Sequence, residues 1–308
     1  MSKKIAVVFA LGIGVGVIVA VDSMREKPCR PSATRSCSTE SSDTGAPRSV
    51  ASDNHVGDGP GKIEPARIPD PDYEDRLPKF IQADFIELDK IESISLFRSG
   101  VGHDSTEVPS IGETCRSKKH YFSPTMEARG GWEADRARKA LDQAGEPIPP
   151  PDDQLAAKVY SPVDGVVTTV APTHWGLEIA IRPDSNPEFR IRISHVFAYP
   201  DIKEGMSVAA GRRIAFTANS TDMLIEWNGG SDSNAQVYLV SYFAVMPDSI
   251  FEAYRSRGVT SREQLVVSRE WRDAHPFKCV GTEFAENYEQ TRPEDTNFVL
   301  TPLPAPVP

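Results

Sequence analysis

Five side chains of the kinds that bind divalent metal ions lie in the middle of the chain. His103 and Asp104 are adjacent in "GVGHDST", and His120, His195 and Asp222 follow at wide spacings. Mixed imidazole and carboxylate ligation suits zinc or another divalent ion. If the fold brings the five together, the sequence predicts a metal-dependent hydrolase. The ion would lower the pKa of its bound water to about 7, and a histidine, first of all His195, would act as general base.

Each of these residues also has a purely structural interpretation. His103 and Asp104 fit a turn in which the aspartate caps neighbouring amides. His195 stands on an apolar strand, where an inward histidine is commonly satisfied by hydrogen bonds, and Asp222 fits a turn cap before a strand. Scattered histidines form hydrogen bonds more often than catalytic sites. Both interpretations stay open at this point.

The elements that must position these side chains are predicted to be strands. The segments "KVYSPVDGVVTTV" (158–170) and "DIKEGMSVAAGRRIAF" (201–216) place glycine at close turns and Val or Ile between them. Glycine supplies positive φ at tight turns, and β-branched residues fill a small barrel. Alternating or β-branched runs at 165–171, 176–183 and 189–198, with another at 223–227, add further strands. We expect a mainly β core over residues 158–246.

A few short helices are predicted around this core. One spans 132–144 and ends at Gly145. A second follows Asp248, its predicted cap, with Phe251 and Tyr254 facing inward. Two more helical turns follow serine caps at 261 and 268. Together these elements predict one β-rich domain over residues 76–300, with a helical part at 247–290.

The N-terminal residues predict an anchor and a stalk. Residues 5–21 carry no charge in 17 positions, which is just long enough for a bilayer-spanning helix of about 17–25 residues. A cleaved signal segment, with secretion of the remainder, is the alternative. Residues 22–75 are rich in Pro, Ser and Asp and poor in apolar side chains, which predicts a disordered stalk. The folded domain is therefore expected outside the cytoplasm, held to the membrane by residues 5–21.

The net charge and the cysteines limit the kinds of function that the sequence allows. The net charge is −10 and no Lys/Arg run is long, so a nucleic-acid surface, which needs clustered cations, is not expected. Cys115 and Cys279 lie in the predicted domain, either as a disulfide, which an oxidising compartment would favour, or as two unrelated thiols.

The glycine pattern resembles a known family. "SPVDGVV", "ISHV" and "IKEGMSVAAGRRIA" are similar to the lysostaphin-type (LytM-like) zinc metallopeptidases, which cut peptidoglycan cross-bridges, over about residues 158–227. The resemblance implies a barrel-sandwich hybrid fold. The biotinyl and lipoyl carrier domains share that core, but they present a modified lysine at a hairpin tip. This chain has no lysine between Lys158 and Lys203.

The family's zinc ligands are not intact in this sequence. The family binds zinc through a His-x-x-x-Asp pair and the last histidine of a His-x-His pair. Here Pro124 stands four residues after His120, where the family has aspartate. His195 matches a separate histidine that assists the water. "STDMLIEW" puts Asp222 and Leu224 at the two His-x-His positions, and leucine cannot bind zinc.

The sequence therefore favours a binding function. We expect a membrane-anchored, extracytoplasmic protein that binds a cell-envelope polymer or an envelope protein without standard zinc peptidase activity. The alternative is a metal-dependent peptidase with a rearranged His/Asp site and one divalent ion, zinc first of all.

Overall fold

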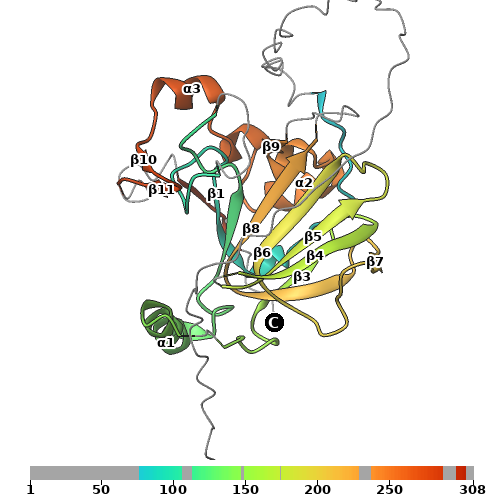
Figure 1. Cartoon of the computed structure of the whole chain (residues 1–308), viewed down its shortest axis with the longest axis vertical. Coiled ribbons are helices and arrows are strands. Elements are labelled where there is room, and N and C mark those ends of the chain that lie inside the picture. The colour runs from blue at the N-terminus through green and yellow to red at the C-terminus, as the bar shows by residue number, and fades with distance from the viewer. Residues whose placement is uncertain are drawn as a thin grey trace, which may run out of the picture. The chain divides into compact units, whose positions relative to one another are not determined.

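A computed structural model describes residues 76–105, 113–146, 149–173, 175–228, 237–286 and 296–302 (Figure 1). All of them lie in one compact unit, Glu64–Pro308. The predicted anchor (5–21) and stalk (22–75) lie outside the described residues. Within the described part of the chain, none of the helices is long and apolar enough to span a membrane.

The described domain is mainly β, as predicted. Ten strands form one antiparallel sheet in the order β12-β1-β2-β8-β6-β5-β4-β7, and β3 and β9 also pair with β8. A separate hairpin pairs β10 with β11. The strands are β1 (Ile91–Ser95), β2 (His120–Pro124), β3 (Ala157–Tyr160), β4 (Gly165–Thr173), β5 (Gly176–Pro183), β6 (Phe189–Ala198), β7 (Ser207–Val208), β8 (Arg213–Trp227), β9 (Tyr238–Val240), β10 (Cys279–Val280), β11 (Glu283–Phe284) and β12 (Asn297–Val299).

The long strand β8 joins the parts of the sheet, and Figure 1 shows it running beside β6. It pairs with β6 on both sides of a register shift between Ser194 and Val196, and with β2 through Thr221 to Met223. His195 lies at that shift with a φ of 61°. A β-bulge of this kind re-aims a side chain next to a site, and here it frees His195 from the alternation of its strand.

Alternating apolar residues of the central strands build the core. Ile179 and Ile181 on β5, and Ile191 and Ile193 on β6, are fully buried. The predicted glycine turns are present, with positive φ at Gly205 and Gly211. Gly165 serves close approach instead, because a Cβ there would come within 2.4 Å of the Arg182 carbonyl oxygen. The glycine motifs thus bring the strands of this core close together.

The described residues also form short helices. They are the α-helices α1 (Gly131–Gln143), α2 (Asp248–Arg255) and α3 (Arg269–Ala274), and the 3-10 turns η2 (Leu88–Lys90), η3 (Tyr242–Ala244) and η4 (Arg262–Leu265). Three sequence predictions hold here: α1 lies within one residue of its predicted bounds, and Ser261 and Ser268 cap η4 and α3.

Two sequence predictions about this part were wrong. Phe251 and Tyr254 are buried as expected, but Pro247 is the N-cap of α2 and Asp248 lies in its first turn, where its carboxylate accepts from Arg262. The strand run after residue 237 ends at β9, because Ser241 accepts from the Phe243 amide and starts η3. A side-chain cap is a local alternative to a strand ladder.

Candidate functional site

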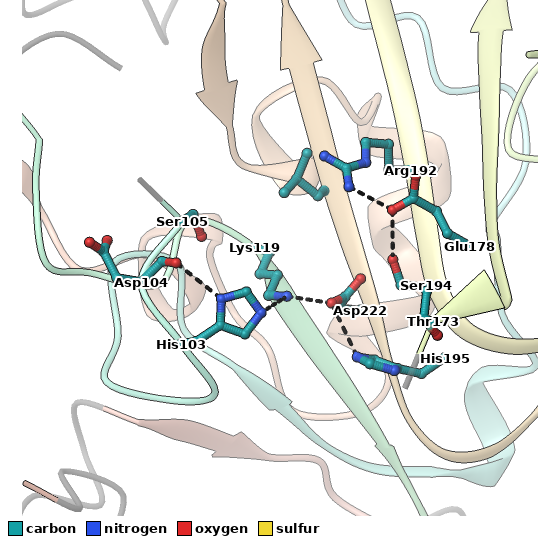
Figure 2. A pocket seen from close by; sticks show the side chains of 11 residues that line it. His103, Asp104, Ser105, Lys119, Thr173, Glu178, Arg192, Ser194, His195 and Asp222 are labelled. Carbon is teal, nitrogen blue, oxygen red and sulfur yellow. Dashed lines mark hydrogen bonds and ion pairs between the residues drawn. The ribbon is translucent and has the colours of Figure 1, made fainter. Parts of the chain in front are cut away.

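A cavity of about 270 Å³ lies where β2, β6 and β8 meet the loop that precedes β2 (Figure 2). Its walls come from segments far apart in the sequence, so only the folded sheet assembles it. The lining residues are His103, Asp104, Ser105, Lys119, Thr173, Glu178, Arg192, Ser194, His195, Asp222 and Leu224.

The structure brings four of the five predicted metal ligands to this cavity. His103, His195 and Asp222 direct their side chains into it (Figure 2). Asp104 contributes mainly backbone, because its carboxylate points away and accepts from the Arg116 amide. Three elements thus supply the three inward groups: the loop before β2, the bulge in β6 and the strand β8.

His120 lies outside the cavity, in the core. Its Nδ1 donates to the Ser95 carbonyl oxygen at 2.8 Å, and its Nε2 accepts from the Ser241 hydroxyl at 2.8 Å. The ring is fully buried, and burial lowers its pKa to about 4 although the Ser95 bond opposes the shift. The histidine is therefore neutral at pH 7 and serves as a satisfied core group.

Lys119, which the sequence reasoning missed, occupies the centre of the cavity. Its Nζ donates to Asp222 Oδ2 at 2.5 Å and to His103 Nε2 at 3.1 Å. The ammonium also lies 4.8 Å from the centroid of the Tyr121 ring. Alternation along a strand could have found it: His120 and Phe122 face the core, so Lys119 and Tyr121 must face the other way.

Lys119 and Asp222 form an ion pair at the centre of the cavity. Burial lowers the pKa of Lys119, but Asp222 and Tyr121 raise it more, so its pKa lies above the ordinary value. Burial raises the pKa of Asp222, but Lys119 and His195 lower it more, so its pKa lies below the ordinary value. Lys119 is therefore a cation and Asp222 an anion at neutral pH.

His195 at this centre is neutral at pH 7. Burial lowers the pKa of His195. The Asp222 carboxylate raises it by less, so the pKa lies below its ordinary value. His195 Nε2 lies 3.6 Å from Asp222 Oδ2. His103 donates from Nδ1 to the Asp104 carbonyl oxygen, so its Nε2 carries the lone pair that accepts from Lys119.

A second group of charges forms the opposite wall. Arg192 donates to Glu178 Oε2 at 2.6 Å and to Glu226 Oε1 at 2.9 Å. Arg190 reaches the other Glu226 oxygen at 3.4 Å. Ser194 also donates to Glu178, at 3.4 Å. Glu226 is thus paired with two arginines.

A disulfide, an ion pair and a backbone hydrogen bond hold the loop that carries His103 in place. Cys115 and Cys279 form a disulfide, one of the two alternatives left by the sequence. Arg98 forms two bonds to Glu113, at 2.7 and 3.1 Å. The Asp104 amide donates to the Thr282 carbonyl oxygen at 2.8 Å. These contacts hold His103 against the cavity.

The donors in this cavity do not fit a zinc centre. A catalytic zinc ion has three protein ligands and an open position. Leu224, two residues after Asp222 on the same face of β8, lines the cavity where the resemblance places the third ligand. Among the described residues, no group of three or more His, Cys, Asp and Glu side chains is arranged to hold a metal ion.

Comparisons with known proteins give similarity to solved structures alone. Neither a family model nor a curated protein matches the sequence. The structures include the catalytic domain of the antimicrobial peptidase lysostaphin from Staphylococcus simulans, with 23% identity, 26% of this chain and 65% of that chain covered, and a TM-score of 0.21. A putative glycyl-glycine endopeptidase lytM from Ruminococcus gnavus shows 18% identity, 29% and 39% coverage, and a TM-score of 0.24. A zinc-containing peptidase from Vibrio cholerae shows 17% identity, 56% and 40% coverage, and a TM-score of 0.30.

These structures include members of the lysostaphin-type peptidases, the family that the glycine motif resembles. The chain spans 35% of the length of a solution structure of lysostaphin and 39% of the length of the Ruminococcus gnavus protein. The chain resembles the lysostaphin-type peptidases, and its counterparts of their zinc ligands are not intact.

Proposed function

We propose that this protein binds a cell-envelope polymer through the Lys119 cavity and does not hydrolyse it with a zinc ion. The polymer class comes from the resemblance to enzymes of peptidoglycan cross-bridges. The cavity contains His195, Asp222 and Leu224, the three positions that the sequence aligns with that family's active-site histidines. Residues 5–21 would hold the domain at the outer face of a membrane, as their composition predicts.

One observation carries the proposal: a cavity persists at these positions while the hydrolytic groups have changed. Leu224 stands at a ligand position and is only 8% exposed. The Lys119 ammonium occupies the space between His103 and Asp222. A fixed positive charge at this point repels a divalent cation. The Lys119 ammonium also occupies the nitrogen and oxygen atoms that such an ion would bind.

The lining suits a short peptide with polar groups. The cavity volume of about 270 Å³ lies near the lower end of small-molecule sites, which begin at about 300 Å³. Arg192 and Glu178 supply a donor and an acceptor on one wall. The Thr173 hydroxyl is buried and has no hydrogen-bond partner among the described residues. Backbone amides of a peptide cross-bridge offer the matching donors and acceptors.

Binding is tested by cosedimentation of the full chain with purified peptidoglycan sacculi. Leu224→Trp fills the cavity and should weaken binding by about tenfold or more, which corresponds to about 1.4 kcal/mol. Val299→Trp is the matched control, because it places the same side chain at a 74% exposed position on the edge strand β12. It should bind like the wild type.

The same preparations separate binding from hydrolysis. Fragments released from sacculi are measured with EDTA and with added zinc, and the wild type should release none in either case. Zinc-dependent release that is lost in His195→Ala would favour the rearranged metal-dependent peptidase. Equal binding by Leu224→Trp, Val299→Trp and the wild type would refute the proposed site.

A further inference from the structure

We infer that Glu178 and Arg192 are specificity-determining residues, which make the Lys119 cavity select an uncharged stretch of its ligand and reject a charged group. The inference deepens the proposed function, and it rests on that function only in taking this cavity as the binding site. It names the kind of group that the cavity admits. That group is an amide or another polar group without net charge, from the interior of a polymer rather than from a charged end.

The charged side chains that face the cavity form two ion pairs (Figure 2). Lys119 Nζ lies 2.5 Å from Asp222 Oδ2. An Arg192 nitrogen lies 2.6 Å from Glu178 Oε2. The carboxylate of Asp104, the remaining charged residue of the lining, points away from the cavity. The four charges that face the cavity therefore sum to zero.

Further contacts surround the arginine pair. Arg192 also donates to Glu226 Oε1 at 2.9 Å, and Arg190 donates to the other Glu226 oxygen. Ser194 donates to the Glu178 carboxylate at 3.4 Å. The Arg192 and Glu178 side chains are 26% and 12% exposed, so water screens their pair only in part. A ligand charge that approached either one would compete with a partner that is already in contact.

This balance of charges favours an uncharged ligand. A charged group that enters a protein interior loses its hydration, and the loss is costly unless an opposite charge takes the place of the water. Among the described residues, no unpaired carboxylate, lysine or arginine faces the cavity to do so. An uncharged amide loses less hydration, and serine and threonine hydroxyls lie in the lining. Exclusion by an uncompensated charge is a common source of specificity.

Glu178 is the position where this balance can be changed with the least damage to the fold. Its side chain is 12% exposed, whereas that of Asp222, the other carboxylate facing the cavity, is 3% exposed. Without the Glu178 charge, Arg192 and Arg190 would share Glu226 alone, and this wall would gain one positive charge. A guanidinium binds carboxylates well, so a carboxylate on the ligand should then be accepted.

The test titrates full chains by calorimetry with four glycine tripeptides that differ only at their ends. One is capped at both ends and uncharged, one has a free carboxylate, one has a free amine, and one has both. The wild type should bind the uncharged peptide at least about tenfold more tightly than each of the others. Glu178→Gln should bind the peptide with the free carboxylate at least about tenfold more tightly than the wild type does.

The matched control is Glu252→Gln. It makes the same chemical change in another glutamate–arginine pair, on α2, where the Glu252 side chain is 60% exposed and lies outside the cavity lining. The control should keep the ranking of the wild type. Arg192→Gln is the opposite change, because it leaves Glu178 without its arginine. It should shift the preference towards the peptide with the free amine.

Each result supports or overturns the inference. A wild type that binds a charged or doubly charged peptide as tightly as the uncharged one would overturn it, and so would a wild type that binds none of the four. A folded Glu178→Gln that keeps the wild-type ranking would also overturn it. Thermal melting identifies variants that do not fold, and the ranking of the wild type then decides alone.

The same measurements separate this inference from the proposed function. If sacculi bind to the cavity and none of the four peptides does, the inference fails and the proposed function stands. If the uncharged peptide binds and sacculi do not, the selection for an uncharged group stands and the proposed polymer is wrong.

Discussion

Breaking the Lys119–Asp222 pair should destabilise the domain strongly. The two side chains are only 6% and 3% exposed, so removal of one leaves the other charge buried without its partner. A buried pair broken in this way costs about 3–5 kcal/mol. Lys119→Met and Asp222→Leu should each lower the free energy of unfolding by that amount, because both keep the approximate shape of the native side chain.

The double variant Lys119→Met/Asp222→Leu tests whether the single losses come from an unpaired buried charge. Replacement of a whole buried pair by apolar groups is often neutral, so the double variant should lose much less than the sum of the single losses. The coupling energy, which is the sum of the two single losses minus the loss of the double variant, should therefore be at least about 3 kcal/mol, the high end for residues in contact. Urea unfolding of the full chain, in buffer with EDTA, measures all four proteins.

The pH dependence of this coupling follows from the two pKa shifts. The lowered pKa of Asp222 gives stability that is present above its ordinary value of 3.8 and lost as the pH falls through the folded pKa. The raised pKa of Lys119 gives stability that is present below its ordinary value of 10.5 and lost as the pH rises through the folded pKa. The coupling should therefore be constant between about pH 5 and 9. Single losses below about 1 kcal/mol that add without coupling would refute the buried-pair interpretation.

Three further predictions concern other parts of the chain. Cys115→Ser/Cys279→Ser opens a link between residues 164 apart and should lower the unfolding free energy by about 2–5 kcal/mol; the wild type with dithiothreitol should unfold at the same urea concentration as the double variant. The neutral, buried His120 should make the wild type lose about 3 kcal/mol between pH 7 and pH 4, because the unfolded state takes up the proton below 6.5 and the folded state only near 4. In His120→Phe that part of the loss should vanish, and an unchanged loss would contradict the assignment. Limited trypsin digestion should cut first within residues 22–75 and leave a stable fragment that begins near residue 76, and intact mass spectrometry would show any earlier cut inside the domain.

The sequence predicts local features of this fold well. The β5 and β6 strands follow from the alternation of their isoleucines, and the turns at Gly205 and Gly211 follow from glycine chemistry. The predicted α2 helix is present because Phe251 and Tyr254 share one face. The end of the last strand run at Ser241 was missed, because a serine cap competes with strand pairing over only two residues.

The sequence predicts a residue of the site only where its type or its motif marks it by itself. His195 and Asp222 stand out by type and by motif, and the structure places both in the cavity. Lys119 does not stand out, because it follows Lys118 in a polar run and lysine usually lies on the surface. Its role depends on pairing between β2 and β8, a contact across about a hundred residues. The placement of His120 depends on the same pairing, because the face of β2 that turns to the core decides which of the neighbours 119 and 120 reaches the cavity.

The Cys115–Cys279 bond also sets an order of events during synthesis. The strands that form the back wall of the cavity are complete by residue 227, but the loop that presents His103 is locked only after residue 279 has been made. A chain that stops before that cysteine would hold most of the sheet and a cavity whose His103 loop is not yet held by the disulfide. The disulfide can therefore form only after the strands of the cavity have been synthesised.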